Sequence, residues 1–267
     1  MTNDADKSYP PTADIDTVYC RAALYSALAI GFQPPSDETL ARLLTSDSKA
    51  SLISAAAMFK PRHHKQIVTS IETLPNAEEI GTRLMSEYHV LFGHTTRGQV
   101  PPYETEYGNE ALFQQPQELG DLMGFYHAFG LKLKTDKHER PDHVSCELEF
   151  FMFLALKEAF AMEQDNREML AETRKAEKLF LRDHLARFVP TFTNQLQREA
   201  PGGFYTKLAA LCLQIVAADC ARLEDALGAA NLGLRPADDD RVPMACGNGA
   251  ECAAMPVVCV PEEADSI

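Results

Sequence analysis

The segment from residue 142 to residue 162 constrains the fold more than any other. Its middle reads ELEFFMFLALKEAF and is apolar around nearly the whole circumference of a helix. A helix with that pattern is buried on most sides instead of along one stripe. Asp142 stands where the N-terminal cap is expected, and the apolar pattern ends near Met162. We therefore expect a long helix that runs through the core.

Other amphipathic helices are expected to pack around it. Apolar residues recur at helical spacing on both sides of this segment. Gly31 ends the first helix, Ser36 caps the second, and Pro190 is expected to kink or divide a later one. Residues 131–134 alternate briefly, but so short a run does not form a sheet without partners. The sequence predicts an all-α, single-domain bundle of about eight to ten helices.

Composition changes at both ends of the chain. Residues 1–13 are polar and contain prolines, which is typical of a flexible lead-in. Beyond Gly233 the sequence contains an aspartate run, four prolines and almost no aromatic residue. A segment of that composition does not bury enough apolar surface to fold. We expect a helical domain over residues 14–233 and a flexible, cysteine-containing tail over residues 234–267.

The charge balance excludes some partners. The 39 acidic and 25 basic residues give a formal charge of −14, which opposes binding to nucleic acid or to anionic membranes and suits a basic partner. The N-terminus lacks the pattern of a signal peptide, and the longest apolar run, Phe150 to Leu156, is far below the roughly 20 residues of a membrane span. We expect a soluble, cytoplasmic protein without a membrane segment. The seven cysteines, an odd number, are expected to be reduced thiols.

A loop between two helices is the first candidate for a binding site. The stretch from Glu87 to Tyr107 reads EYHVLFGHTTRGQVPPYETEY and is broken by two glycines and the pair Pro101-Pro102. Tyrosines and glutamates alternate after the prolines. Because loops of this kind lie at the surface, the stretch is a candidate docking site for something both apolar and basic, such as a peptide.

Catalytic motifs are absent from the sequence. It contains no phosphate-binding loop, no dinucleotide fingerprint, no nucleophile elbow and no C-x-x-C pair. His138 and His143 resemble a zinc-protease motif, but their spacing is wrong for one helix face and Pro141 lies between them. Two alternatives to peptide binding stay open: a metal-dependent hydrolase built on His138 and His143, and a redox-responsive or metal-responsive module that uses the tail cysteines Cys246, Cys252 and Cys259.

The start of the core helix is the second candidate. Pro141 precedes it, Asp142 can accept hydrogen bonds from the first-turn amides, and Glu147 follows His143 one turn later on the same face. An N-terminal cap with a His–Glu pair explains the aspartate. It does not explain why an imidazole follows.

Three pieces of sequence, in this order, resemble the TorD/DmsD family of cytoplasmic redox-enzyme maturation chaperones, to which the NarJ-type proteins are related. They are E-Y with L-F over residues 87–92, P-P-Y-E-T with a further tyrosine over residues 101–107, and P-D-H followed by E-L-E-F over residues 141–150. The resemblance implies an all-helical, non-enzymatic chaperone. Its partners would be the twin-arginine signal peptide and the apo form of a molybdopterin-containing oxidoreductase subunit.

The resemblance also implies a role and a site. The chaperone would aid cofactor insertion and delay export until the subunit is folded, without a cofactor of its own. A homodimer, swapped at the hinge 135–141, is compatible with the long helices. The family's proposed peptide site is lined by the residues that match Tyr88, Leu91, Phe92, Pro102, Tyr103, Asp142 and His143.

The chemistry of the peptide agrees with that site. Such a signal peptide offers two guanidinium groups and then an apolar segment, so its receptor needs carboxylates beside aromatic or aliphatic surface. We expect Glu104, Glu106 and Asp142 to supply the carboxylates. Leu91 and Phe92 end an amphipathic helix and are better explained as core. Tyr103, Glu104 and His143 are the strongest candidates for direct contact, because none of them is needed to fill a core.

Overall fold

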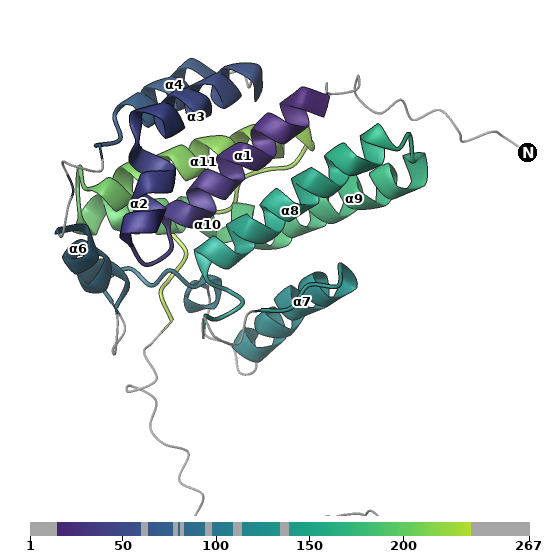
Figure 1. Cartoon of the computed structure of the whole chain (residues 1–267). Coiled ribbons are helices and arrows are strands. Elements are labelled where there is room, and N and C mark those ends of the chain that lie inside the picture. The colour runs from purple at the N-terminus through teal and green to yellow at the C-terminus, as the bar shows by residue number, and fades with distance from the viewer. Residues whose placement is uncertain are drawn as a thin grey trace, which may run out of the picture. The chain divides into compact units, whose positions relative to one another are not determined.

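The computed structural model describes residues 15–59, 64–76, 80, 83–93, 98–108, 114–133 and 139–235. The described part is all-α, as predicted (Figure 1). Isolated bridges occur among the described residues, including Tyr103 with His143 and Tyr107 with Leu234. The predicted lead-in 1–13, the tail from residue 236 on and His138 lie outside the described residues. The helices are α1 (Ile15–Gly31), α2 (Asp37–Leu44), α3 (Ser46–Phe59), α4 (His64–Glu72), α6 (Arg83–Phe92), α7 (Gln114–Ala128), α8 (Val144–Glu163), α9 (Arg167–Phe180), α10 (Ala186–Glu199) and α11 (Phe204–Arg222).

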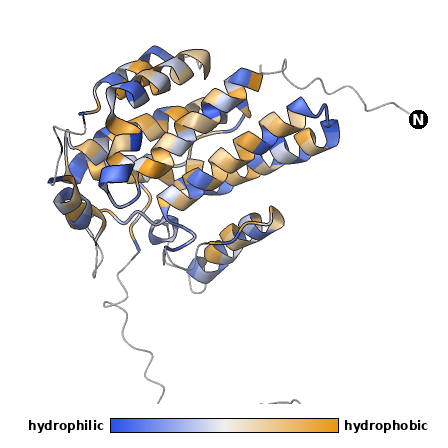
Figure 2. Ribbon diagram, viewed as in Figure 1, coloured by the Kyte–Doolittle hydropathy of each residue, from blue (hydrophilic) through white to orange (hydrophobic). Residues whose placement is uncertain are grey.

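Helix α8 lies between α1 and α9, which pack along it (Figure 1). Tyr25 of α1 packs against Phe151 of α8 with the rings tilted and 4.6 Å between ring centroids. Apolar residues run along both helices, as Figure 2 shows. The predicted core helix is confirmed, although it is not buried on every side, because Leu156 and Phe160 are 39% and 49% exposed.

The second helix begins as the sequence predicts. The hydroxyl of Ser36 accepts a hydrogen bond from the amide of Thr39, and the side chain of Thr39 accepts one from the amide of Ser36. This reciprocal pair satisfies two amides that have no partner inside the helix.

The helix does not divide at Pro190, the second of the two predicted effects of this proline. The chain changes from α9 to α10 through a π-helical segment, η2 (Leu181–Leu185), and Pro190 lies inside α10. A proline inside a helix leaves the carbonyl four residues earlier without its amide partner. Here that carbonyl, on Ala186, accepts from the amide of Gly228 at 2.7 Å. A Cβ at residue 228 would lie 2.8 Å from the same oxygen, so only glycine approaches closely enough.

The core contains a network of buried charges. Arg21 of α1, only 2% exposed, contacts Glu158 of α8, Glu177 of α9 and Asp219 of α11. Two further arginines complete the network from its rim: Arg174 donates to Glu158 at 2.6 Å, and Arg222 donates to both Asp219 and Glu177 at 2.7 Å. The network therefore joins four helices, and it connects α1 with α8, α9 and α11 more than 130 residues along the chain.

This network predicts a pH effect on stability. Burial raises the pKa of Asp219 to about 6, although Arg21 opposes the shift. The folded protein therefore binds this proton at a higher pH than the unfolded chain, so the group adds stability as pH falls from about 7 towards 4. We expect the free energy of unfolding to rise by about 1 kcal/mol more in the wild type than in Asp219→Asn between pH 7.5 and pH 5. Urea unfolding of both proteins at the two pH values measures this, and equal pH dependence would contradict it.

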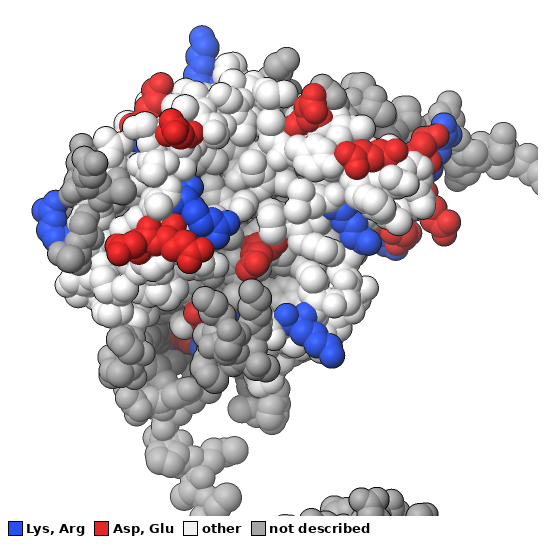
Figure 3. All heavy atoms as spheres, in the orientation of Figure 1, with Lys and Arg blue, Asp and Glu red and all other residues white. Residues whose placement is uncertain are grey.

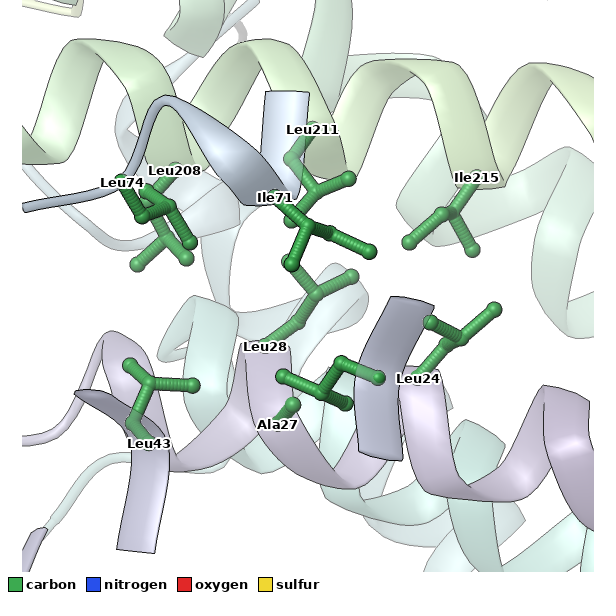
Figure 4. Close-up of a pocket in the computed structure, with 10 residues that line it drawn as sticks. Leu24, Ala27, Leu28, Leu43, Ile71, Leu74, Leu208, Leu211 and Ile215 are labelled. Atoms are coloured by element: carbon green, nitrogen blue, oxygen red, sulfur yellow. The ribbon is translucent and has the colours of Figure 1, made fainter. Parts of the chain in front are cut away.

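An apolar pocket lies between α1 and its neighbouring helices. Aliphatic side chains from α1, α2, α3, α4 and α11, and from the turn after α4, point toward one another there (Figure 4). The residues that line it are Leu24, Ala27, Leu28, Leu43, Leu52, Ile71, Leu74, Leu208, Leu211 and Ile215. Because no polar side chain lines the pocket, it has nothing to orient a ligand, and we interpret it as part of the core.

Among the helices that the structure describes, one has the length and apolarity of a membrane span. It is α11, and 61% of the tested window is buried inside the protein. Core helices of soluble proteins commonly have the same properties.

Candidate functional site

The loop that follows α6 is held by its own backbone and by a buried tyrosine. The amide of Val100 donates to the carbonyl of Leu91 at 2.7 Å, which folds the chain back over the end of α6. Pro101 and Pro102 keep the next residues extended. The hydroxyl of Tyr107 then donates to the carbonyl of Pro101 at 2.8 Å, and its side chain is fully buried. The predicted surface loop is therefore anchored at both ends.

This loop lies against the start of α8, so the two candidate segments form one site. Tyr103 and His143 form an antiparallel bridge. The amide of Glu104 donates to the carbonyl of Asp142, and the amide of Val144 donates to the carbonyl of Pro102, each at 2.8 Å. The rings of Tyr103 and His143 meet edge to face at 5.3 Å. Tyr103 and His143 are far apart in the sequence, and the fold brings them into direct contact.

The prediction that Asp142 caps α8 is wrong. His143 is the N-cap, and its Nδ1 accepts from the amide of Ser145 at 3.1 Å. The carboxylate of Asp142 is turned toward the loop, where it accepts from the amide and the hydroxyl of Thr105 at 3.3 and 2.7 Å. The bridge to the loop explains the difference, because it rotates Asp142 away from the first-turn amides.

Glu104 and His143 are not free surface groups, contrary to the prediction. Each is only 1% exposed. Both oxygens of Glu104 are used: Oε1 accepts from Nε and Nη2 of Arg187 at 2.9 and 2.6 Å, and Oε2 lies 2.9 Å from Nδ1 of His184. The carboxylate thus ties the loop to α10 and η2. It is unavailable to a peptide unless Arg187 moves.

The imidazole of His143 is neutral at physiological pH. Burial, and secondarily the nearby Arg140, lowers the pKa of His143 to about 3. The predicted His–Glu pair does not form. Nε2 of His143 and both carboxyl oxygens of Glu147 are buried without a hydrogen-bond partner among the described residues. Burial raises the pKa of Glu147 well above its usual range, and the neighbouring Glu104 and Asp142 add to the shift.

Tyr88, Leu91 and Phe92 form the apolar floor beside the loop. All three are at most 6% exposed, which agrees with the interpretation of Leu91 and Phe92 as core. Tyr88 meets Phe92 edge to face at 4.9 Å, and both rings contact Tyr205 of α11. Burial raises the pKa of the Tyr88 phenol, with a smaller contribution from the carboxylate of Glu139. The phenol of Tyr88 therefore lies close enough to Glu139 to feel its charge.

The other polar groups of the site surround Arg140, whose side chain is 38% exposed. Arg140 donates from Nε and Nη2 to the two carboxylate oxygens of Asp142 at 3.0 and 2.7 Å. Its guanidinium carbon lies 4.2 Å from the ring centroid of half-buried Tyr103, and its Nη1 lies 3.3 Å from a carboxylate oxygen of Glu106. Sequence reasoning concentrated on carboxylates and missed Arg140 and Thr105. The position of Arg140, directly before the proline of the P-D-H piece, is the signal that was available.

The loop has a second neighbour at the end of the described chain. The amide of Gly108 donates to the carbonyl of Gly233 at 2.8 Å, and the amide of Arg235 donates to the carbonyl of Glu106 at 2.9 Å. The guanidinium of Arg235 contacts Glu118 of α7 at 2.9 and 3.1 Å. Leu234 and Arg235, the first two residues of the predicted tail, therefore pack against the loop and α7.

Within the described residues, no cluster of three or more His, Cys, Asp or Glu side chains is arranged to hold a metal ion. His138 and the tail cysteines Cys246, Cys252 and Cys259, on which the two alternative functions depend, lie outside those residues.

Comparison with known proteins identifies the family. Residues 61–194, half of the chain, match the family model described as nitrate reductase delta subunit. The chain belongs to this family. The matched segment contains the loop, the start of α8, and Arg140 and Arg187.

Named relatives of this delta-subunit family protein are chaperones. The chaperone protein TorD of Vibrio cholerae serotype O1 (strain ATCC 39315 / El Tor Inaba N16961) is 25% identical over 203 residues, which cover 74% of this chain and 90% of the relative. The perchlorate reductase assembly chaperone protein of Dechloromonas aromatica (strain RCB) is 27% identical over 214 residues, 76% of this chain and 89% of the relative. The selenate reductase assembly chaperone protein of Thauera selenatis is 38% identical over 106 residues, 39% of this chain and 52% of the relative.

These relatives confirm the resemblance seen in the sequence. The protein is a chaperone related to the TorD and NarJ proteins, and it is not an enzyme.

Proposed function

We propose that this protein is a cytoplasmic assembly chaperone for a reductase, and that it binds the twin-arginine signal peptide of the reductase's molybdopterin-containing subunit. By holding the apo subunit it would aid cofactor insertion and delay export until folding is complete. Relatives named as assembly chaperones of selenate and perchlorate reductases support the reductase as partner. The main support for the peptide site is the direct contact between Tyr103 and His143. This contact brings the aromatic ring of Tyr103 next to the carboxylate of Asp142.

The geometry divides the predicted site residues into two roles. Tyr103 is half-buried, whereas Glu104 and His143 are buried, so Tyr103 is the residue expected to contact the peptide. Glu104 and His143 hold the loop and the helix tip in place from below. Glu106, 16% exposed, and Asp142 are the carboxylates that pair with Arg140, which lies over the ring of Tyr103.

We expect a basic peptide to be selected by individual contacts at the site instead of by a broad acidic surface. On the face shown in Figure 3, acidic and basic side chains are interspersed, without a large area of one sign. A broad acidic field is therefore not what would orient a dibasic peptide there. Bidentate pairing with a carboxylate, together with stacking on an aromatic ring, distinguishes arginine from lysine.

Binding of synthetic peptides tests the proposal. One peptide carries two adjacent arginines followed by an apolar segment, and a second carries lysines in their place. We expect the arginine peptide to bind more tightly, and Tyr103→Ala to weaken it by about five- to thirtyfold, since a cation–π contact in a partly desolvated site contributes about 1–2 kcal/mol. Isothermal titration calorimetry measures both, and affinity should fall as salt rises.

A matched control uses another tyrosine of this chain. Tyr19 is 40% exposed on α1, and its hydroxyl donates to Glu163, away from the loop. Tyr19→Ala should leave peptide affinity unchanged. Equal binding of the two peptides, together with no loss in Tyr103→Ala, would refute the proposed site.

A further inference from the structure

The contacts of Arg140 are those of a bound arginine ligand. Its guanidinium forms a two-pronged pair with Asp142, donates to Oγ1 of Thr105 at 2.9 Å and lies over the face of Tyr103. Glu106 closes the far side at 3.3 Å. A carboxylate fork, a hydroxyl acceptor, a second carboxylate and an aromatic face are together the arrangement that recognises a planar guanidinium in preference to an ammonium group.

The backbone of Arg140 is held independently of its side chain. The amide of His143 donates to the carbonyl of Arg140 at 3.2 Å, which closes a turn that contains Pro141. The amide of Arg140 itself donates to the carboxylate of Glu139 at 3.0 Å. The side chain is 38% exposed, unlike that of Asp142, which is fully buried. The guanidinium can therefore swing into solvent while the turn and the bridge to the loop remain intact.

The groups that surround the guanidinium of Arg140 would keep their positions after that movement. Asp142 would still accept from the amide and hydroxyl of Thr105, and the side-chain amide of Gln115 would still donate to the same hydroxyl at 3.1 Å. These bonds keep the carboxylate aimed at the same place. A second guanidinium, brought by another chain, would meet the same partners.

We propose that Asp142, Thr105, Glu106 and the ring of Tyr103 form a guanidinium-binding subsite, that Arg140 fills it in the free chaperone, and that one arginine of the bound peptide displaces Arg140. This inference rests on the proposed function. It makes Arg140 an internal competitor that sets a threshold for binding. Because an attached side chain competes at high effective concentration, a single arginine does not displace it, whereas a peptide that also binds through a second arginine and an apolar segment does.

Competition by Arg140 should lower the apparent affinity for the peptide by a measurable factor. The apparent affinity of a site is reduced by the fraction of time for which it is open, so a subsite occupied about nine-tenths of the time binds about tenfold more weakly than an open one. Arg140→Ala should therefore bind the arginine peptide about tenfold more tightly than the wild type does. Arg140→Lys keeps the charge but loses the fork, and should give a smaller gain. Arg182→Ala removes an arginine that pairs with its exposed neighbour Asp183, and should change nothing.

Salt dependence separates competition from a structural role. In the wild type, binding exchanges one guanidinium for another, so the net charge of the subsite does not change. In Arg140→Ala the peptide brings a new positive charge to an unpaired carboxylate, so affinity should fall more steeply with salt than in the wild type. A variant that merely loosened the turn would not steepen this dependence.

The experiment is a titration of the arginine and lysine peptides into the wild type, Arg140→Ala, Arg140→Lys and Arg182→Ala at low and high salt, with thermal unfolding to show that each variant is folded. Tighter binding and a steeper salt dependence in Arg140→Ala support the inference, including the case in which only this variant binds measurably. Weaker or unchanged binding in a folded Arg140→Ala, while the wild type binds, overturns the inference and leaves the proposed function standing. If neither protein prefers the arginine peptide, both fail.

Discussion

Replacing Arg21 with methionine is expected to lower the free energy of unfolding by about 3–5 kcal/mol. Arg21 is 2% exposed and is the cation that lies among Glu158, Glu177 and Asp219. Methionine fills a similar volume but leaves carboxylates in the core with one positive charge fewer. Removal of one partner from a buried ion network costs far more than the whole network contributes. Urea unfolding followed by circular dichroism measures the change.

The control for this substitution is Arg167→Met at the exposed start of α9. A surface change of that kind should alter stability by no more than about 0.5 kcal/mol. If Arg21→Met proved as stable as the control, the core would not depend on this network.

The second large effect is expected at Arg187. Its guanidinium forms two hydrogen bonds to the 1% exposed carboxylate of Glu104, which lies at the centre of the loop. Arg187→Met leaves that carboxylate with His184 as its remaining side-chain partner, near the buried Glu147. We expect a loss of about 2–4 kcal/mol in unfolding free energy, because the buried charge is left without its strongest partner. We also expect weaker binding of the arginine peptide, since the loop loses its tie to α10.

Arg182→Met is the control here, because Arg182 lies near Arg187 in sequence but pairs with its exposed neighbour Asp183. An exposed pair of this kind contributes about 1 kcal/mol or less. Unchanged peptide affinity in Arg187→Met would show that the position of the loop does not depend on Glu104.

Helical periodicity was sufficient to predict the architecture. The core helix, the Ser36 cap and the absence of strands from the described residues all follow from local patterns. Pro190 shows the limit of such patterns. Its effect on the helix depends on whether the carbonyl of Ala186 finds another donor, and that donor, Gly228, lies far along the chain.

The site was predictable in its location but not in its internal pairing. The three sequence pieces indicated the loop and the helix tip, and the fold brings these two segments into contact. Which groups face solvent depends on tertiary partners: Glu104 is buried because Arg187 and His184 reach it, and Asp142 turns from the helix because Thr105 bonds to it. A single sequence does not show which acidic side chain already has its arginine. Arg21 and its carboxylates, brought together from distant helices, were missed for the same reason.

The most direct test of the account is backbone hydrogen exchange of the full chain with and without the arginine peptide. The amides of Glu104 and Val144 join loop to helix tip, and they lie beneath the surface on which the peptide is proposed to rest. We expect the peptide to slow exchange in residues 98–108 and 139–146, and to leave α3 and α4 unchanged. Protection confined to another part of the bundle, with binding otherwise intact, would contradict the account.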